Sequence, residues 1–348
     1  MFSTYITPTY VLVVSLLLVV LIKVEINYNI LQLQEASKQS LRPSKGFLPK
    51  CVDQVYTQSS RKQNLLKGAM VFENRHEWPV CKFEKDGPIP VVFIVLGRSG
   101  SDATWSTISK LAGGKSPLGE HTGENKVKAM EFLTKMKTEE AGKWWLTAHL
   151  CEFAHKYCDR PLAAFKWKPF IDSWKLPAAQ GILKQLAEFD DPRIKVIYMT
   201  RNPLDVMISN YKHERNKNLT AHCHTGDQLC IEELKKLGTG LHLPTETLVQ
   251  DLKNQFEAFA FFEKTLDEMN IHHVKTTYKK LYQQDHAEEW MKLFKFLGKG
   301  PTEGLTMDDI VNSFELAPTF QKNHNVTLSN YEEVRDLLIG TDFENLLH

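Results

Sequence analysis

The chain lacks an excess of charge of either sign. Its 348 residues carry 43 lysines and arginines against 42 aspartates and glutamates, and the formal net charge at pH 7 is +1. Proteins that hold nucleic acid through a general electrostatic field have a clear surplus of positive charge. The composition therefore argues against a nucleic-acid partner, and any polyanion must be met by a local patch of basic residues.

Two common signatures of phosphate and metal sites are also missing. The chain has no G-x-x-x-x-G-K-[ST] motif, with which P-loop enzymes hold nucleotide phosphates. Its histidines and cysteines show no metal-ligand spacing: His222 and His224 flank Cys223, but this trio lacks partners at the spacing of a zinc site. We therefore expect no metal, and an ordinary kinase of the P-loop type is disfavoured.

A strand, a small-residue loop and a helix are predicted around residues 90–111. Residues 91–96 form a continuous apolar run, which is short for a helix and typical of a buried parallel strand. Residues 97–105, GRSGSDATW, are small and rich in hydroxyls, and residues 106–111 follow with apolar side chains at helical spacing. Backbone N–H groups and a helix N-terminus converge on an anion in such an arrangement, although an ordinary strand-to-helix turn is the alternative.

A second strand and helix carry another basic residue at their junction. Residues 194–200, IKVIYMT, predict a strand, and Arg201 stands at its end. Pro203 and Asp205 then mark the first turn of a helix, on which Ser209 lies eight residues after the arginine. This stretch therefore predicts a second strand that is followed directly by a helix.

Together the two stretches resemble the PAPS-dependent sulfotransferases, PAPS being 3′-phosphoadenosine 5′-phosphosulfate. In that family an R/K-S/T-G-T-T-x-L loop binds the 5′-phosphosulfate, and an R-[DN]-P-x-D-x-x-x-S segment, here Arg201 to Ser209, binds the 3′-phosphate. The resemblance spans about residues 90–298, and Asp102 and Ala103 look like an insertion in the first pattern, which leaves open whether Ser101 or Thr104 faces the phosphate. The cofactor residues that the resemblance implies are Arg98, Ser99, Gly100, Ser101, Thr104, Trp105, Arg201 and Ser209.

The resemblance also suggests catalytic residues. In the family a glutamate or histidine accepts the proton of the acceptor hydroxyl, and in the titratable loop 113–124 we take Glu120 as the first candidate, with His121 and Glu124 behind it. The predicted strand at residues 161–170 places Lys166 and Lys168 on one face, where one of them, Lys166 by preference, would reach the sulfuryl group. Solvated loop residues and exposed lysines are the ordinary alternatives.

One further cofactor residue is suggested near the C-terminus. Cytosolic members close an R-K-G loop on the 3′-phosphate, and Lys322 would serve similarly here although R-K-G itself is absent. The implied reaction is an in-line transfer of the sulfuryl group from PAPS to a hydroxyl, with a glycan as the first choice of acceptor. Arg98 and the loop amides would stabilise the charge that grows on the bridging oxygen.

Two other classes of function stay open from the residues. One is a P-loop phosphotransferase that uses ATP and Mg²⁺, against which the missing motif argues. The other is an inactive sulfotransferase-like module that binds a glycan, which the apparent insertion in the phosphosulfate loop favours. Dependence on a metal would mark the first, and ligand binding without turnover would mark the second.

The N-terminal part of the chain predicts a membrane anchor and a stem. Residues 5–22 are uncharged and mainly apolar, close to the lower limit of about 17 residues for a membrane-spanning helix. The short tail before them, residues 1–4, has no lysine or arginine, and no small-residue cleavage site follows them. Both absences favour a retained signal anchor over a cleaved signal peptide. Residues 23–85 are polar and irregular, as in a stem, and residues 86–348 would form the globular domain.

Sequons and cysteines favour an oxidising lumen. Asn218 and Asn325 each begin an N-x-T acceptor for N-glycosylation, and the six cysteines are an even number. We therefore predict a single-pass type II protein of the Golgi membrane with its catalytic domain in the lumen. Spacing and elimination suggest these disulfides: Cys151–Cys158, Cys223–Cys230 and Cys51–Cys81.

The expected fold is one three-layer α/β domain. A mainly parallel sheet would carry helices on both faces, with a P-loop-like phosphosulfate-binding loop and the cofactor at the carboxyl ends of the strands. Residues 272–278 predict a further strand, while residues 229–269 and 331–339 are helical in pattern.

Overall fold

The computed structural model describes ten stretches of the chain. They are residues 52–54, 81–83, 85–114, 118–120, 138–169, 173–189, 191–215, 223–282, 287–317 and 323–347. All of them fall in one compact unit, Lys50–His348, of the two into which the chain divides. Within these stretches no helix is long and apolar enough to cross a membrane. The anchor predicted at residues 5–22 lies outside the described residues and stays a prediction.

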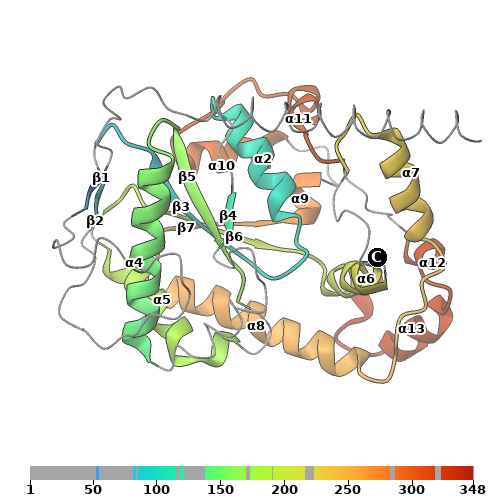
Figure 1. Ribbon diagram of the computed structural model, residues 1–348. Coiled ribbons are helices and arrows are strands. Elements are labelled where there is room, and N and C mark those ends of the chain that lie inside the picture. The colour runs from blue at the N-terminus through green and yellow to red at the C-terminus, as the bar shows by residue number, and fades with distance from the viewer. Residues whose placement is uncertain are drawn as a thin grey trace, which may run out of the picture. The chain divides into compact units, whose positions relative to one another are not determined.

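A five-stranded parallel sheet forms the centre of this unit (Figure 1). The strands stand in the order β4-β5-β3-β6-β7. Their bounds are Ile89–Val95 for β3, Leu118–Glu120 for β4, Leu162–Trp167 for β5, Lys195–Thr200 for β6 and His273–Thr277 for β7. The strands predicted at residues 91–96, 161–170, 194–200 and 272–278 are thereby confirmed as β3, β5, β6 and β7.

The central strand β3 is buried on both faces. Its residues 91–95 have no exposed surface, and Phe93 pairs with Lys166 of β5 on one side and with Ile197 of β6 on the other. A strand buried on both faces needs apolar side chains in both directions, which explains the continuous apolar run. The end of β3 therefore opens at the middle of the sheet's carboxyl edge.

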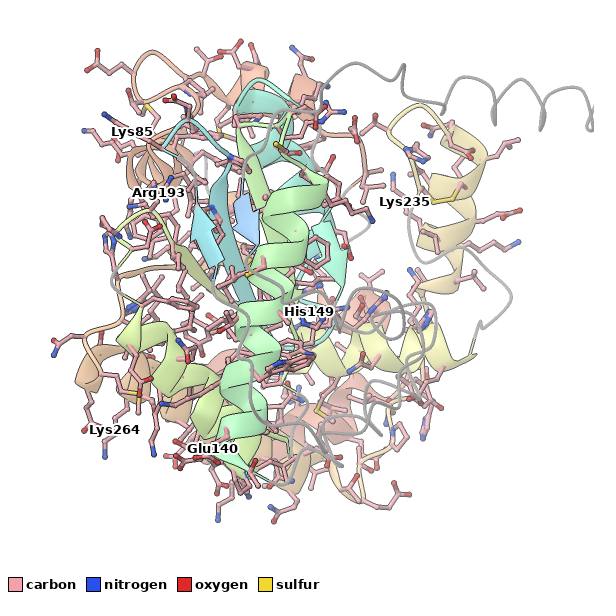
Figure 2. All side chains as sticks on the ribbon, turned by 60° about the vertical axis from the view of Figure 1, so that its left-hand side comes forward. Lys85, Glu140, His149, Arg193, Lys235 and Lys264 are labelled. Atoms are coloured by element: carbon pink, nitrogen blue, oxygen red, sulfur yellow. A yellow bond between two sulfur atoms is a disulfide. The ribbon has the colours of Figure 1, made fainter. Side chains whose placement is uncertain are left out.

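Three long helices cover one face of the sheet. They are α4 (Glu139–Lys156), α5 (Pro177–Glu188), which follows the short η1 (Ser173–Lys175), and α8 (Leu248–Glu268). Figure 2 shows α4 lying over the sheet, with His149 along its length. His149 is held within the core face, because its Nδ1 lies 2.8 Å from the carbonyl oxygen of Trp145 and its ring packs on Phe165.

The opposite face carries shorter helices. These are α2 (Ser101–Leu111), α9 (Tyr278–Tyr282), α10 (Ala287–Leu297) and α11 (Met307–Ser313). Trp105 of α2 and Trp290 of α10 are buried with the strand residues Phe93 and Ile197 in one cluster. Helices on both faces of a parallel sheet confirm the predicted three-layer α/β arrangement.

The last part of the chain packs against the helix that follows β6. That helix, α6 (Pro203–Arg215), buries Leu204 and Ile208 against residues of α8, α13 (Tyr331–Leu338) and η2 (Glu344–Leu347). The short α12 (His324–Thr327) precedes α13, and α7 (Gln228–Leu237) lies between α6 and α8 in the chain. The residues near the end of the chain thus lie close to the start of α6.

Two short strands lie within the segment predicted as a stem. β1 (Val52–Gln54) and β2 (Cys81–Phe83) pair antiparallel. Phe83 is buried in the core beside α4, and the Arg193 guanidinium, paired with Asp191 at 2.7 Å, donates to the carbonyl oxygen of Phe83. The folded domain therefore begins upstream of the predicted boundary at residue 86, because an aromatic residue of the stem completes its core.

One predicted disulfide is present among the described residues. Cys223 and Cys230 are bonded with their Cα atoms 5.6 Å apart, and this bond ties the start of α7 to the segment before it. Cys151 and Cys158 are also disulfide-bonded. That these two cysteines are bonded to each other stays a prediction. The predicted Cys51–Cys81 bond also stays a prediction, because Cys51 lies outside the described residues.

Candidate functional site

The loop after β3 turns sharply before α2 begins. Arg98 and Gly100 both have positive φ values, 62° and 81°, in the left-handed region. A Cβ atom at Gly100 would lie 2.6 Å from Cε2 of Tyr278, the first residue of α9. The loop therefore needs glycine at this position for its backbone angle and for its close approach to the Tyr278 ring.

Gly100→Ala is expected to destabilise the domain by about 3 kcal/mol. The left-handed backbone costs about 1 kcal/mol for a residue with a side chain, and the overlap with Tyr278 adds about 2 kcal/mol. Denaturant unfolding would measure the loss. Gly304→Ala is the matched control, because Gly304 has φ 68° and open space around its Cβ position. Equal losses in the two variants would contradict the close packing of the loop on Tyr278.

Asp102 and Ala103 lie in helix α2 and not in the loop itself. They form the first turn of α2, and the Thr104 N–H donates to the carbonyl oxygen of Gly100 at 3.0 Å. The family pattern suggested an insertion because Thr104 and Trp105 come later in the sequence than the pattern expects. In the structure both residues belong to helix α2, which continues without a break from Ser101. Asp102 consequently lies at the N-terminus of α2.

Two of the predicted cofactor residues point into the core instead of the loop. The Thr104 hydroxyl donates to the Gly100 carbonyl and pairs with the Tyr282 hydroxyl at 3.0 Å, and Thr104 has no exposed surface. Trp105 is 1% exposed in the core cluster. The uninterrupted helix turns both residues toward the sheet, so we assign them to packing and not to cofactor binding.

The remaining loop residues offer backbone groups at the helix N-terminus. Within the described part of the chain no side chain caps α2, whose preceding residue is Gly100. Ser99 is buried, and its hydroxyl donates to the Leu96 carbonyl oxygen at 2.6 Å, so it braces the loop. Ser101 stands at the first helical position. The N–H groups of this first turn therefore remain for an anion, as expected at a helix N-terminus.

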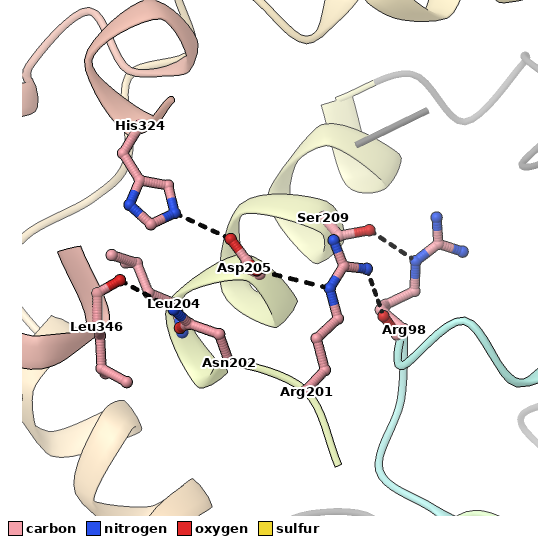
Figure 3. Close-up of polar contacts among 8 residues, drawn as sticks. All are labelled: Arg98, Arg201, Asn202, Leu204, Asp205, Ser209, His324 and Leu346. Atoms are coloured by element: carbon pink, nitrogen blue, oxygen red, sulfur yellow. Dashed lines mark hydrogen bonds and ion pairs between the residues drawn. The ribbon is translucent and has the colours of Figure 1, made fainter. Parts of the chain in front are cut away.

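The two predicted anion-binding segments meet at the carboxyl ends of β3 and β6 (Figure 3). The Arg98 Nε donates to the Ser209 Oγ at 3.2 Å, and the Arg201 Nη1 donates to the Arg98 carbonyl oxygen at 2.9 Å. The Arg201 guanidinium also lies over the Tyr278 ring, 4.5 Å from its centroid. The Ser209 hydroxyl of α6, the Tyr278 ring of α9 and the Arg98 carbonyl oxygen thereby hold two arginines beside the loop.

Positive charge is concentrated at this junction. Burial and the neighbouring Arg201 guanidinium lower the pKa of Arg98, while Asp102 acts in the opposite direction. Burial and the charge of Arg98 also lower the pKa of Lys212, a third cation, which follows Ser209 by three residues on the same face of α6. Sequence reasoning missed Lys212, although its helical spacing from Ser209 was a signal. Mutually repelling cations of this kind are stabilised when an anion binds among them.

Lys166 lies buried beside the loop. It is 1% exposed, and its Nζ is 2.5 Å from Oδ1 of Asp102. Asp102, the negative residue that looked out of place in an anion-binding loop, thus balances the charge of a buried lysine. An ammonium group this deeply buried needs such a partner. Lys168, the alternative, follows the end of β5 and is half-buried.

Glu120 is in register with Lys166. It ends β4, and its Cα pairs with that of Lys166 across the parallel ladder. The structure therefore brings the backbone positions of the predicted base and the predicted lysine together. His121, Glu124 and Lys322 lie outside the described residues. Within the described stretches no group of three or more His, Cys, Asp or Glu residues is arranged to hold a metal ion.

Comparison with known protein families finds a match in the second half of the chain. Residues 182–341 match the family model described as sulfotransferase domain. The match supports a sulfotransferase family. It covers β6, α6 and the C-terminal helices, and hence Arg201, Ser209 and Lys212. A search of curated proteins finds no match to the chain.

The sulfotransferase match and the loop are independent observations. The matched region begins after β3, the loop and Lys166, so the likeness of the loop to a phosphosulfate site rests on its own residues and geometry. The structure joins the two, because Arg98 from the loop bonds Ser209 within the matched region. Sulfuryl transfer is the general chemistry that this match supports.

Proposed function

We propose that this protein transfers a sulfuryl group from PAPS to a hydroxyl group of a glycan. The observation that carries the proposal is the meeting of Arg98, Arg201 and Ser209 at the carboxyl edge of the sheet, beside the N-terminus of α2. PAPS has a phosphosulfate at its 5′ end and a phosphate at its 3′ position. A site with two arginines and a free helix start fits two anionic groups on one molecule.

Each side chain has a distinct task in this proposal. The first-turn amides of α2 and Arg98 hold the 5′-phosphosulfate, and Arg201 with Ser209 holds the 3′-phosphate. Binding energy from the 3′-phosphate, which does not react, orients the reacting end and selects PAPS over ordinary nucleotides. Lys212 adds positive charge to the same region.

Lys166 and Glu120 would act at the transfer itself. The acceptor oxygen attacks sulfur in line with the bond to the departing phosphate, and negative charge grows on the oxygen that bridged them. The buried Lys166 ammonium would stabilise that charge, and its ion pair with Asp102 would hold it in position. Glu120, which pairs in register with Lys166, accepts the proton of the acceptor hydroxyl.

The cellular setting is part of the same proposal. The apolar residues 5–22 would anchor the chain as a type II protein of the Golgi membrane, with the domain in the lumen. The Cys223–Cys230 disulfide is typical of an oxidising compartment, and Asn325, which begins a sequon, is exposed on α12. A lumenal site favours a glycan as the acceptor, since glycans are assembled there.

Nucleotide binding by the purified full chain tests the donor. In calorimetric titrations, 3′-phosphoadenosine 5′-phosphate (PAP), the desulfated product, is expected to bind in the presence of EDTA and far more tightly than AMP. Binding of ATP·Mg²⁺ in place of PAP would overturn the proposal in favour of a phosphotransferase. If PAP binds, incubation with PAPS and a panel of glycans, tyrosine peptides and small alcohols identifies the acceptor. Binding without transfer to any of these would favour an inactive module.

A further inference from the structure

A buried histidine from the end of the chain contacts the helix that carries the 3′-phosphate site. His324 is the first residue of α12 and is 7% exposed. Its Nε2 lies 2.9 Å from Oδ1 of Asp205, which is in the first turn of α6 and is equally buried (Figure 3). A polar contact this deeply buried joins residues that are far apart in the sequence.

Asp205 in turn contacts Arg201. Its second oxygen, Oδ2, is 3.8 Å from the Arg201 Nε, and both side chains are at most 10% exposed. The two oxygens of one carboxylate therefore face His324 on one side and Arg201 on the other (Figure 3). The result is a buried chain of polar contacts, His324–Asp205–Arg201, which ends at the loop carbonyl of Arg98.

The chemistry of the carboxylate defines the role of the histidine. An ionised carboxylate only accepts hydrogen bonds, so the His324 Nε2 carries the hydrogen and donates it to Asp205. The other ring nitrogen, Nδ1, is buried and has no hydrogen-bond partner among the described residues. His324 thus supplies one directed hydrogen bond that fixes where the carboxylate sits.

Main-chain hydrogen bonds, and not only the His324 ring, hold α12 in place. The Leu241 N–H donates to the Thr327 carbonyl at 2.8 Å, and the Ser329 N–H donates to the Leu241 carbonyl at the same distance. These main-chain bonds dock the segment on residues that lie before α8. Changing the ring therefore alters the contact with Asp205 while the docking of α12 remains.

We infer that His324 is a positioning residue for the 3′-phosphate site, acting through Asp205 on Arg201. The inference rests on the proposed function. A guanidinium recognises a phosphate through parallel hydrogen bonds in a fixed plane, so its orientation decides the strength of the contact. With His324 in place, Asp205 holds Arg201 in one orientation. Without it, the carboxylate turns and the arginine is no longer presented to the phosphate.

A comparison of two ligands tests this role in the full chain. PAP and AMP differ only in the 3′-phosphate, so the dissociation constant of AMP divided by that of PAP isolates that contact. In His324→Leu the ratio is expected to fall about tenfold, through weaker binding of PAP, while the affinity for AMP stays unchanged. His324→Gln, whose amide nitrogen can donate from nearly the same position, is expected to restore most of the ratio.

A second histidine provides the matched control. His273 of β7 is also largely buried, with its Nδ1 2.8 Å from the Ile271 carbonyl oxygen, and it makes no contact with Asp205. His273→Leu should leave the ratio unchanged. If His324→Leu does not fold, His324→Asn takes its place, because the asparagine amide is too short to reach Asp205. The ratio in His324→Asn is then compared with the ratio in His324→Gln.

Three outcomes would overturn the inference or its basis, and they are distinguishable. The positioning role would be overturned if His324→Leu left the ratio unchanged. It would also be overturned if His324→Asn and His324→Gln gave the same ratio. An equal loss of PAP and AMP affinity would also overturn it, because it would show a general structural effect. A wild-type chain that does not prefer PAP over AMP would overturn the proposed function itself.

Discussion

Arg201→Ala is expected to weaken PAP binding about 100-fold or more while AMP binding changes little, because charge-assisted bidentate hydrogen bonds are among the strongest polar contacts. In the structure this guanidinium stacks on Tyr278 and donates to the Arg98 carbonyl oxygen, and its loss removes the positive charge at the proposed 3′-phosphate position. Calorimetric titration of PAP and AMP would measure the change, and sulfuryl transfer from PAPS should become undetectable.

One further variant separates charge from geometry at this position. Arg201→Lys keeps the positive charge but loses the planar fork, so it is expected to recover only part of the affinity for PAP. Arg335→Ala is the control for removal of an arginine, since Arg335 is a partly exposed residue of α13 that pairs with Glu332 and Asp336. Full turnover in Arg201→Ala would rule out this residue as a ligand of the 3′-phosphate.

Lys166→Met is expected to lower kcat by about 100- to 1000-fold with little change in the KM for PAPS. The reason is that a charge which stabilises the leaving oxygen acts mainly in the transition state, where removing one such group costs about this much. Methionine keeps most of the buried volume, so the fold should persist. Steady-state kinetics with PAPS and the acceptor found in the screen would measure both constants.

The partner of this lysine provides the accompanying variants. Asp102→Asn should have a smaller effect on kcat, because the ammonium remains in the site, and the double variant Asp102→Asn/Lys166→Met should resemble Lys166→Met alone. Lys168→Met tests the other lysine of the strand segment. If Lys168→Met lowers kcat more than Lys166→Met, the catalytic role belongs to Lys168 instead.

Local patterns predicted most of the regular elements. A continuous apolar run marked β3, and the Pro-x-Asp start with apolar residues behind it marked α6, because both signals depend on neighbours in the chain. The helix predicted over residues 229–269 was partly wrong. It is divided into α7, which ends at Leu237, and α8, which begins at Leu248, since glycines 238 and 240 and Pro244 interrupt it.

The roles of individual loop residues were harder to predict. Motif matching assigned the hydroxyl of Thr104 to the phosphate and treated Asp102 as part of an insertion. The exact start of α2 at Ser101 turned Thr104 into the core and brought Asp102 to Lys166. A shift of one or two residues in a helix start rotates every side chain that follows, which a motif without an alignment does not register.

Local sequence patterns were enough to predict the fold class and the two basic segments. The packing of the folded chain was needed to show which groups meet there: Arg98 with Ser209, Lys166 with Asp102, and His324 with Asp205. These pairs are separated by 111, 64 and 119 residues. Local propensities depend on near neighbours, whereas contacts over such separations arise from the packing of whole strands and helices, and that packing forms the site.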